Sequence, residues 1–186
     1  MKIVCFGDSN TYGFDPRSYF GGRYDADCRW VDILAEKTTW SFVNMGQNGL
    51  AIPEAEFYGA MLSKPDIGML IIMLGSNDIL QGLSAKSVAG RMERFISTLS
   101  IPKERILLVS PPHFTPGLWV EDEKTLENSS LLGSYYSELA NKHGLHFADS
   151  GKWGIPLCYD GVHFTAAGHK LFADKLFEHI LKTKES

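Results

Sequence analysis

The sequence has few cysteines and no long hydrophobic run. Its three cysteines in 186 residues form no C-x-x-C pair, so the sequence suggests neither a disulfide framework nor a cysteine-rich zinc site and favours a reducing compartment. The most apolar stretch, Ile67 to Leu74, is far shorter than the roughly 20 residues of a membrane-spanning helix. The apolar run at the amino terminus stops at Gly7 with no export-signal pattern behind it. We therefore expect a cytoplasmic protein with no membrane partner.

The sequence also lacks an excess of positive charge. Its 18 Lys and Arg residues face 22 Asp and Glu residues, a formal net charge of -4, which is the wrong sign for a surface that coats nucleic acid. Neither G-x-x-x-x-G-K-[ST] nor G-x-G-x-x-G follows the first apolar run, and no H-E-x-x-H spacing occurs. We expect no nucleic-acid partner, no metal and no cofactor.

What is present is the composition of an ordinary globular protein, with 44% hydrophobic, 12% aromatic and 22% charged residues. No internal repeat, low-complexity tract or Pro/Gly/Ser linker divides the chain. The sequence therefore predicts one domain over residues 1–186.

Short apolar runs alternate with amphipathic stretches along the chain. The runs predict five strands, at 2–6, 42–44, 67–74, 106–109 and 145–148. The amphipathic stretches predict helices, at 27–37, 54–62, 84–99, 123–143 and 165–181. Continuous apolar strands separated by helices indicate a parallel sheet covered on both faces, that is, a three-layer α/β/α doubly wound fold. Ligands of such a fold bind at the carboxyl ends of the strands.

Two segments rich in aromatic residues, Gly and Pro show no clear periodicity. They are residues 12–24 and 111–120. Each is either a binding loop or a surface excursion without a ligand role, and the sequence favours neither.

Two short motifs follow the first two strands. Gly7–Asn10 would expose a serine, Ser9, at a strand end, although such a serine can also be the N-cap of a helix. The glycines of Asn44–Gly49 would let backbone amides face a ligand, or would simply make a turn.

Two further motifs complete the set. Gly75–Asp78 follows the third strand and offers the side-chain amide of Asn77, or a helix cap. Asp160–His163 precedes the last helix, and a carboxylate bonded to one ring nitrogen leaves the other free to take a proton from an alcohol. Each motif is weak alone, but together they place a nucleophile, amide donors and an acid–base pair at one end of the sheet.

These blocks resemble the SGNH hydrolases, also called GDSL esterases and lipases, over the range from Phe6 to Phe164. The resemblance implies a flavodoxin-like SGNH fold with Ser9 as nucleophile, His163 as base and Asp160 as the acid that orients it. It implies an oxyanion hole made by the backbone N–H groups of Ser9 and Gly49 and the side chain of Asn77.

One position departs from the usual family pattern, because Asn10 stands where leucine is common. That position varies in the family and is not catalytic. Four further blocks look like the intracellular arylesterase and acyltransferase branch: Arg29–Trp30, Ile72–Gly75, Val109–Pro112 and Gly161–Thr165. Members of that branch commonly form oligomers whose loops close a narrow acyl pocket, so the resemblance implies a homo-oligomer.

The expected function is that of a serine esterase that hydrolyses or transfers small acyl groups through an acyl-enzyme. A carbohydrate deacetylase or a thioesterase would use the same machinery, and a non-catalytic module that binds a small ligand is the alternative of a different class. Residues outside the triad expected to contact a small-molecule ester, or to brace the site, are Asp8, Tyr12, His113 and Trp119.

Overall fold

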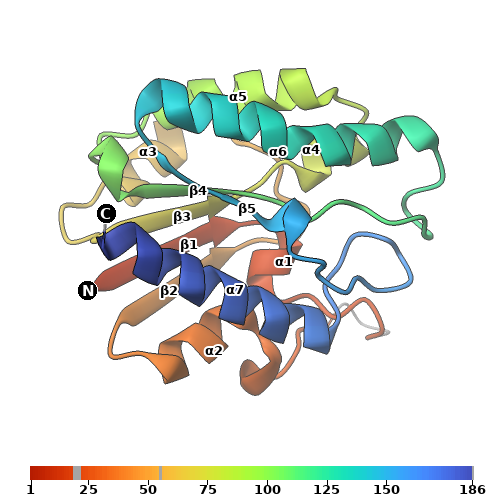
Figure 1. Ribbon diagram of the computed structural model, residues 1–186, viewed down its shortest axis with the longest axis horizontal. Coiled ribbons are helices and arrows are strands. Elements are labelled where there is room, and N and C mark those ends of the chain that lie inside the picture. The colour runs from red at the N-terminus through yellow and green to blue at the C-terminus, as the bar shows by residue number, and fades with distance from the viewer. Residues whose placement is uncertain (19–21, 55, 186) are drawn as a thin grey trace.

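The computed structural model describes residues 1–18, 22–54 and 56–185 and contains one parallel sheet (Figure 1). Its strands pair in the order β2-β1-β3-β4-β5. They are β1 (Lys2–Gly7), β2 (Ser41–Gly46), β3 (Met69–Met73), β4 (Ile106–Ser110) and β5 (His146–Asp149). The predicted five-stranded parallel sheet is confirmed, with strand limits that differ from the predicted ones by at most two residues.

Helices cover both faces of this sheet, as Figure 1 shows. The longer ones are α2 (Trp30–Lys37), α3 (Glu56–Leu62), α5 (Ala85–Ser97), α6 (Glu123–His143) and α7 (Ala166–Glu185). The expected helix at 27–37 begins only at Trp30, because residues 26–28 form a 3-10 turn. Two short helices that the sequence did not predict, α1 (Ser9–Tyr12) and α4 (Ser76–Leu80), follow β1 and β3 almost directly.

Alternate side chains of each strand enter two separate cores. Val4 and Phe6 of β1 pack with α5 and α6, whereas Ile3 and Cys5 pack with α2 and α7. All four are buried, so the strand is continuously apolar from Ile3 to Phe6, as expected of a parallel strand covered on both faces. The doubly wound three-layer α/β/α fold is thereby confirmed.

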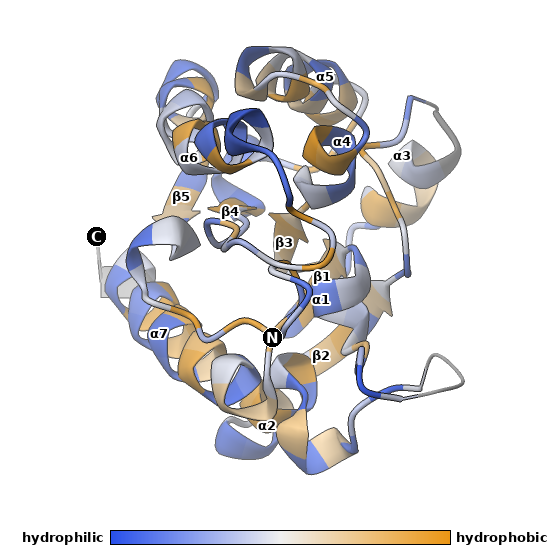
Figure 2. Cartoon of the chain, turned by 90° about the vertical axis from the view of Figure 1, so that its right-hand side faces the viewer, coloured by the Kyte–Doolittle hydropathy of each residue, from blue (hydrophilic) through white to orange (hydrophobic). Residues whose placement is uncertain are grey.

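The carboxyl ends of the strands share one edge of the sheet, and Figure 2 looks onto it. Helix α1 lies there at the end of β1, between the two helical layers. Within the described ranges, no helix is both long and apolar enough to span a bilayer.

Candidate active site

Ser9 is the first residue of α1, immediately beyond β1. Asp8 caps this helix, because its carboxylate accepts the backbone N–H of Asn10 at 3.0 Å. The cap is therefore Asp8 and not Ser9, which leaves the Ser9 hydroxyl available for other partners. Gly46 of β2 allows the close approach of α1, since a Cβ at that position would collide with the backbone of Thr11 and Tyr12.

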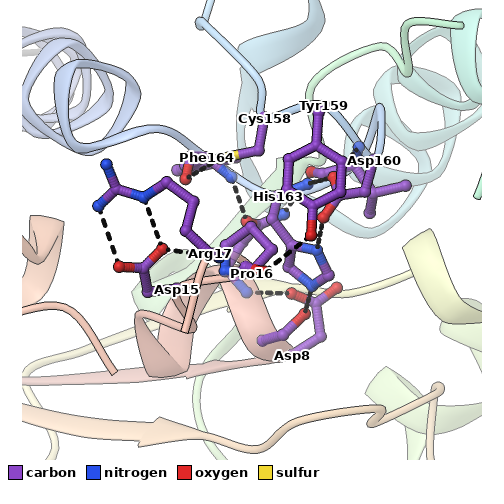
Figure 3. Close-up of polar contacts among 12 residues, drawn as sticks. Asp8, Asp15, Pro16, Arg17, Cys158, Tyr159, Asp160, His163 and Phe164 are labelled. Atoms are coloured by element: carbon purple, nitrogen blue, oxygen red, sulfur yellow. Dashed lines mark hydrogen bonds and ion pairs between the residues drawn. The ribbon is translucent and has the colours of Figure 1, made fainter. Parts of the chain in front are cut away.

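The turn before α7 brings His163 to Ser9 across 154 residues of sequence. His163 Nε2 lies 2.9 Å from Ser9 Oγ, and His163 Nδ1 lies 2.7 Å from Asp160 Oδ2. The other carboxylate oxygen of Asp160 accepts the backbone N–H groups of Val162 and His163, each at 2.9 Å. In Figure 3 the His163 ring lies between Asp160 and Asp8. A hydroxyl, an imidazole and a carboxylate thus form one hydrogen-bonded chain.

This chain of three side chains is nearly closed to solvent. Ser9 is 7% exposed, Asp160 1% and His163 2%. Burial acts to raise the pKa of Asp160, but the hydrogen bonds from the His163 ring and from the two backbone N–H groups outweigh it, so the pKa lies below its ordinary value. Asp160 is therefore held as a carboxylate, which favours a proton on the Nδ1 atom of His163 and leaves Nε2 facing Ser9 as the acceptor.

Two aromatic side chains enclose the His163 ring. The ring of Phe14 lies 4.8 Å from it in a tilted arrangement, and the ring of Trp119 lies 4.9 Å from it edge-on. The backbone N–H of Trp119 donates to the carbonyl of Asp160 at 3.1 Å, and the Tyr159 hydroxyl donates to the carbonyl of Pro16 at 2.8 Å (Figure 3). The loops after β1 and β4 are thus joined to the turn that carries His163.

A cavity of about 160 Å³ opens at this point. Its lining is more apolar than polar because Phe14 and Trp119 form much of the wall. The complete lining consists of Ser9, Phe14, Asn48, Gly49, Asn77, Trp119 and His163. The structure therefore brings Gly49 and Asn77, from the loops after β2 and β3, to the same cavity as Ser9 and His163.

Three residues of the cavity lining, Ser9, Gly49 and Asn77, carry N–H groups without a partner among the described residues of the protein. In the described part of the chain, the backbone N–H groups of Ser9 and Gly49 make no hydrogen bond to the protein. Gly49 has a φ of 73°, a conformation that favours glycine. The side-chain amide of Asn77 donates one N–H to the carbonyl of Leu50 at 3.1 Å, which fixes the amide and leaves its second N–H for a ligand.

The remaining predicted residues lie outside the cavity lining. Asp8 is buried behind Ser9, and burial, the largest influence on it, raises the pKa of its carboxyl to about 6. The ring of Tyr12 lies under the guanidinium of Arg23 at 4.5 Å, and His113 lies against Gly151. Asp8 therefore braces the α1 turn, and neither Tyr12 nor His113 reaches the space beside Ser9.

Sequence reasoning missed two residues of the lining, Phe14 and Asn48. Phe14 belongs to the predicted loop 12–24, of which residues 19–21 lie outside the described residues. Asn48 lies inside the second motif, directly before Gly49. The sequence signal that could have identified Phe14 was its aromatic side chain, two positions after Tyr12. Across the described ranges, no group of three or more His, Cys, Asp or Glu side chains is placed to hold a metal ion.

Comparison with solved structures finds close agreement of fold. The chain matches an arylesterase described as putative from Agrobacterium tumefaciens str. C58 with 27% identity and a TM-score of 0.83, covering 98% of this chain and 99% of the other. It matches the M. smegmatis aryl esterase with 25% identity and a TM-score of 0.84, at the same coverage. A carbohydrate acetylesterase family member from Sinorhizobium meliloti, at 23% identity, shares the fold, with a TM-score of 0.83 and coverage of 98% of both chains.

Comparison of sequences gives the family. A search of curated proteins finds no match. The model of the GDSL-like Lipase/Acylhydrolase family, by contrast, matches residues 5–171, which include the strand-end motifs that line the cavity. The chain therefore belongs to the GDSL-like lipase/acylhydrolase family, the SGNH hydrolases, and is a hydrolase of ester bonds.

Proposed function

We propose that this hydrolase is a serine esterase that removes small acyl groups through an acyl-enzyme on Ser9. The observation that carries the proposal is the 2.9 Å contact between Ser9 Oγ and His163 Nε2. It is accompanied by the 2.7 Å contact between His163 Nδ1 and Asp160 Oδ2. His163 accepts the hydroxyl proton as Ser9 Oγ bonds to the ester carbonyl carbon. The same proton then passes to the leaving oxygen as its bond to the acyl carbon breaks.

The second half of the reaction reverses these roles. Water gives a proton to His163 while its oxygen attacks the acyl carbon, and the Ser9 oxygen leaves with that proton. An alcohol in place of water would give acyl transfer with the same residues. Asp160 stays ionised throughout and stabilises the imidazolium that forms in each step.

The unpaired donors of the cavity lining would form the oxyanion hole. Charge develops on the carbonyl oxygen as each tetrahedral intermediate forms, and donors already held in place stabilise it more than they stabilise the ester. We assign this role to the N–H groups of Ser9 and Gly49 and to the amide of Asn77. The hydrogen bond from Asn77 to Leu50 supports the assignment, because it holds the amide before substrate arrives.

The size of the cavity supports a small acyl group. A volume of about 160 Å³ beside Ser9, walled by Phe14 and Trp119, accommodates an acetyl or propionyl group more readily than a long chain. Carbohydrate deacetylase and thioesterase activities would use the same residues. The likeness to two aryl esterases at 25% and 27% identity favours an oxygen ester with an aryl leaving group.

A fluorophosphonate probe and a series of 4-nitrophenyl esters test this proposal. The probe should label Ser9, as located by peptide mass spectrometry, whereas a non-catalytic binding module would not be labelled. Ser9→Ala should lower kcat by roughly 10⁴- to 10⁶-fold and Asn77→Ala by about 10²- to 10³-fold. Ser97→Ala, which changes an exposed helical serine, is the matched control and should retain labelling and kcat.

The ester series tests the acyl size. The acetyl ester should have a kcat/KM about tenfold or more above that of the octanoyl ester, because a pocket of about 160 Å³ holds an acetyl group but only part of an octanoyl chain. A matched S-aryl thioacetate separates esterase from thioesterase activity. Near-normal hydrolysis by Ser9→Ala would refute the proposed nucleophile.

A further inference from the structure

We infer that Asn10, the residue after the nucleophile, is a positioning residue that holds His163 against Ser9. The inference rests on the proposed catalytic roles of Ser9 and His163. It concerns a position where leucine is common in the family and where the sequence alone suggested no part in the reaction.

The evidence is a two-pronged contact between the Asn10 side chain and the backbone on both sides of His163. Its Oδ1 accepts the N–H of Phe164 at 2.9 Å, and its Nδ2 donates to the carbonyl of Val162 at 3.1 Å. Asn10 is 3% exposed, so water does not compete effectively for either contact. The Asn10 side-chain amide thus makes the same pair of hydrogen bonds that a backbone peptide group of an adjacent strand would make. Its partners are the two residues that flank His163.

The backbone of Asn10 is itself held from two directions. Its N–H donates to Asp8 at 3.0 Å, and its carbonyl accepts the indole N–H of Trp30, also at 3.0 Å. Trp30 is buried in the core between α2 and α7, where its ring packs against Phe172. The backbone of Asn10 is therefore fixed in place. The two hydrogen bonds of its side-chain amide in turn hold the turn that carries His163.

Other hydrogen bonds in the described part of the chain tie this turn to loops and not to α1, among them those of Tyr159 to Pro16, of Trp119 to Asp160 and of Tyr24 to Phe164. Apart from the contact between Ser9 and His163, the two Asn10 bonds are the hydrogen bonds that join residues 8–12 to residues 158–164. Asp160 orients the imidazole, but it belongs to the same turn as His163, so it cannot fix the distance from that turn to Ser9. The packing of Phe14 and Trp119 on the ring is much less directional than a hydrogen bond.

Leucine in this position would have nearly the same shape, since both side chains branch at Cγ, but would offer no polar atom. The N–H of Phe164 and the carbonyl of Val162 would then be buried without these partners. The turn could relieve this only by moving, and a displacement of about 1 Å in a catalytic group can lower the rate about 100-fold. The effect should appear in kcat, because Asn10 does not line the cavity.

The test is Asn10→Leu, assayed with 4-nitrophenyl acetate. We expect kcat to fall about 10- to 100-fold while KM changes less than about threefold. Asn128→Leu is the matched control, because the Asn128 side chain also accepts one backbone N–H, from Ala85, and donates to one carbonyl, of Lys124, both at 2.8 Å. It joins α5 to α6 away from the cavity, so its loss should lower the melting temperature and leave kcat within about twofold.

A double-mutant cycle with His163→Ala shows whether Asn10 acts through the histidine. In the His163→Ala background, Asn10→Leu should change the residual rate by less than about twofold, because there is no imidazole left to position. An equal loss of kcat in both backgrounds, or a normal kcat for Asn10→Leu alone, overturns the inference while leaving the proposed function intact. A normal kcat for His163→Ala overturns the proposed function and the inference together.

Asn10→Ala covers the case in which the leucine variant does not fold. It makes no steric demand and removes the same two hydrogen bonds, so the same cycle applies. Circular dichroism and thermal unfolding establish that each variant is folded before kinetics are compared. A folded Asn10→Ala enzyme with the kcat of the wild type overturns the inference.

Discussion

The substitution Asp160→Asn removes one charge and replaces one hydrogen-bond acceptor with a donor, while the shape of the side chain stays nearly the same. One oxygen of Asp160 accepts two backbone N–H groups, from Val162 and His163, at 2.9 Å each. An asparagine must keep its carbonyl oxygen there, because an NH₂ group would face two donors. Its NH₂ group then occupies the place of Asp160 Oδ2, which lies 2.7 Å from His163 Nδ1.

An NH₂ group at that position donates to Nδ1 and so selects the opposite tautomer of the imidazole. The proton of neutral His163 would sit on Nε2, 2.9 Å from Ser9 Oγ, where it blocks transfer of the hydroxyl proton. The wrong tautomer and the lost stabilisation of the imidazolium together cost a factor of about 10⁴ in kcat, or about 5 kcal/mol in activation free energy. KM should change little, because Asp160 does not line the cavity.

The assay is hydrolysis of 4-nitrophenyl acetate under saturating substrate near pH 7.5. Asp122→Asn is the matched control: its carboxylate also accepts a backbone N–H, from Thr125 at 2.9 Å, but it caps α6 away from the cavity. Ser9 labelling by fluorophosphonate should slow in parallel with kcat in Asp160→Asn and remain normal in the control. A kcat within about tenfold of the wild type would refute the orienting role of Asp160.

Two further predictions concern stability. Burial raises the pKa of Asp8 from 3.8 to about 6, so the stability that its protonated form contributes is lost as the pH rises through that window. Asparagine stays uncharged at every pH. Asp8→Asn should therefore raise the free energy of unfolding, measured in urea, by about 1–3 kcal/mol at pH 8 and leave it unchanged at pH 4. Gly161 and Gly82 have φ of 83° and 87°, but only at Gly161 would a Cβ collide, with the Thr115 carbonyl; Gly161→Ala should therefore cost about 1–3 kcal/mol more than Gly82→Ala in thermal unfolding. Equal effects in either comparison would contradict the corresponding reasoning.

The architecture was predictable from sequence because its strands are buried on both faces. Such strands are continuous apolar runs, as in the run that contains β3, and the helices between them are long enough to show a 3.6-residue period. The helices α1 and α4 have four and five residues, too few for any periodicity to appear. The sequence motifs could therefore mark the positions of Ser9 and Asn77 without showing that each begins or lies within a helix.

The candidate site was predictable only to the level of strand ends. Topology places Ser9 and the turn at His163 on one edge of the sheet, but residues 154 apart meet at 2.9 Å only if particular side chains hold both segments. Phe14 and Asn10 are among these side chains. The role of each depends on contacts with residues remote in the chain, which the sequence does not show. A polar residue beside a nucleophile has no interpretation until its partners are known.

The sheet and the site are held by different kinds of interaction. The parallel sheet is stabilised by buried apolar area, which tolerates small shifts of a strand or helix, whereas proton transfer between Ser9 and His163 depends on fractions of an ångström. The sheet places Ser9 and His163 only approximately. Short polar contacts such as those of the Asn10 amide then hold the two side chains at hydrogen-bonding distance. Substitutions in the two apolar cores should therefore lower stability before they lower kcat, while loss of such a contact should lower kcat in an enzyme that is still folded.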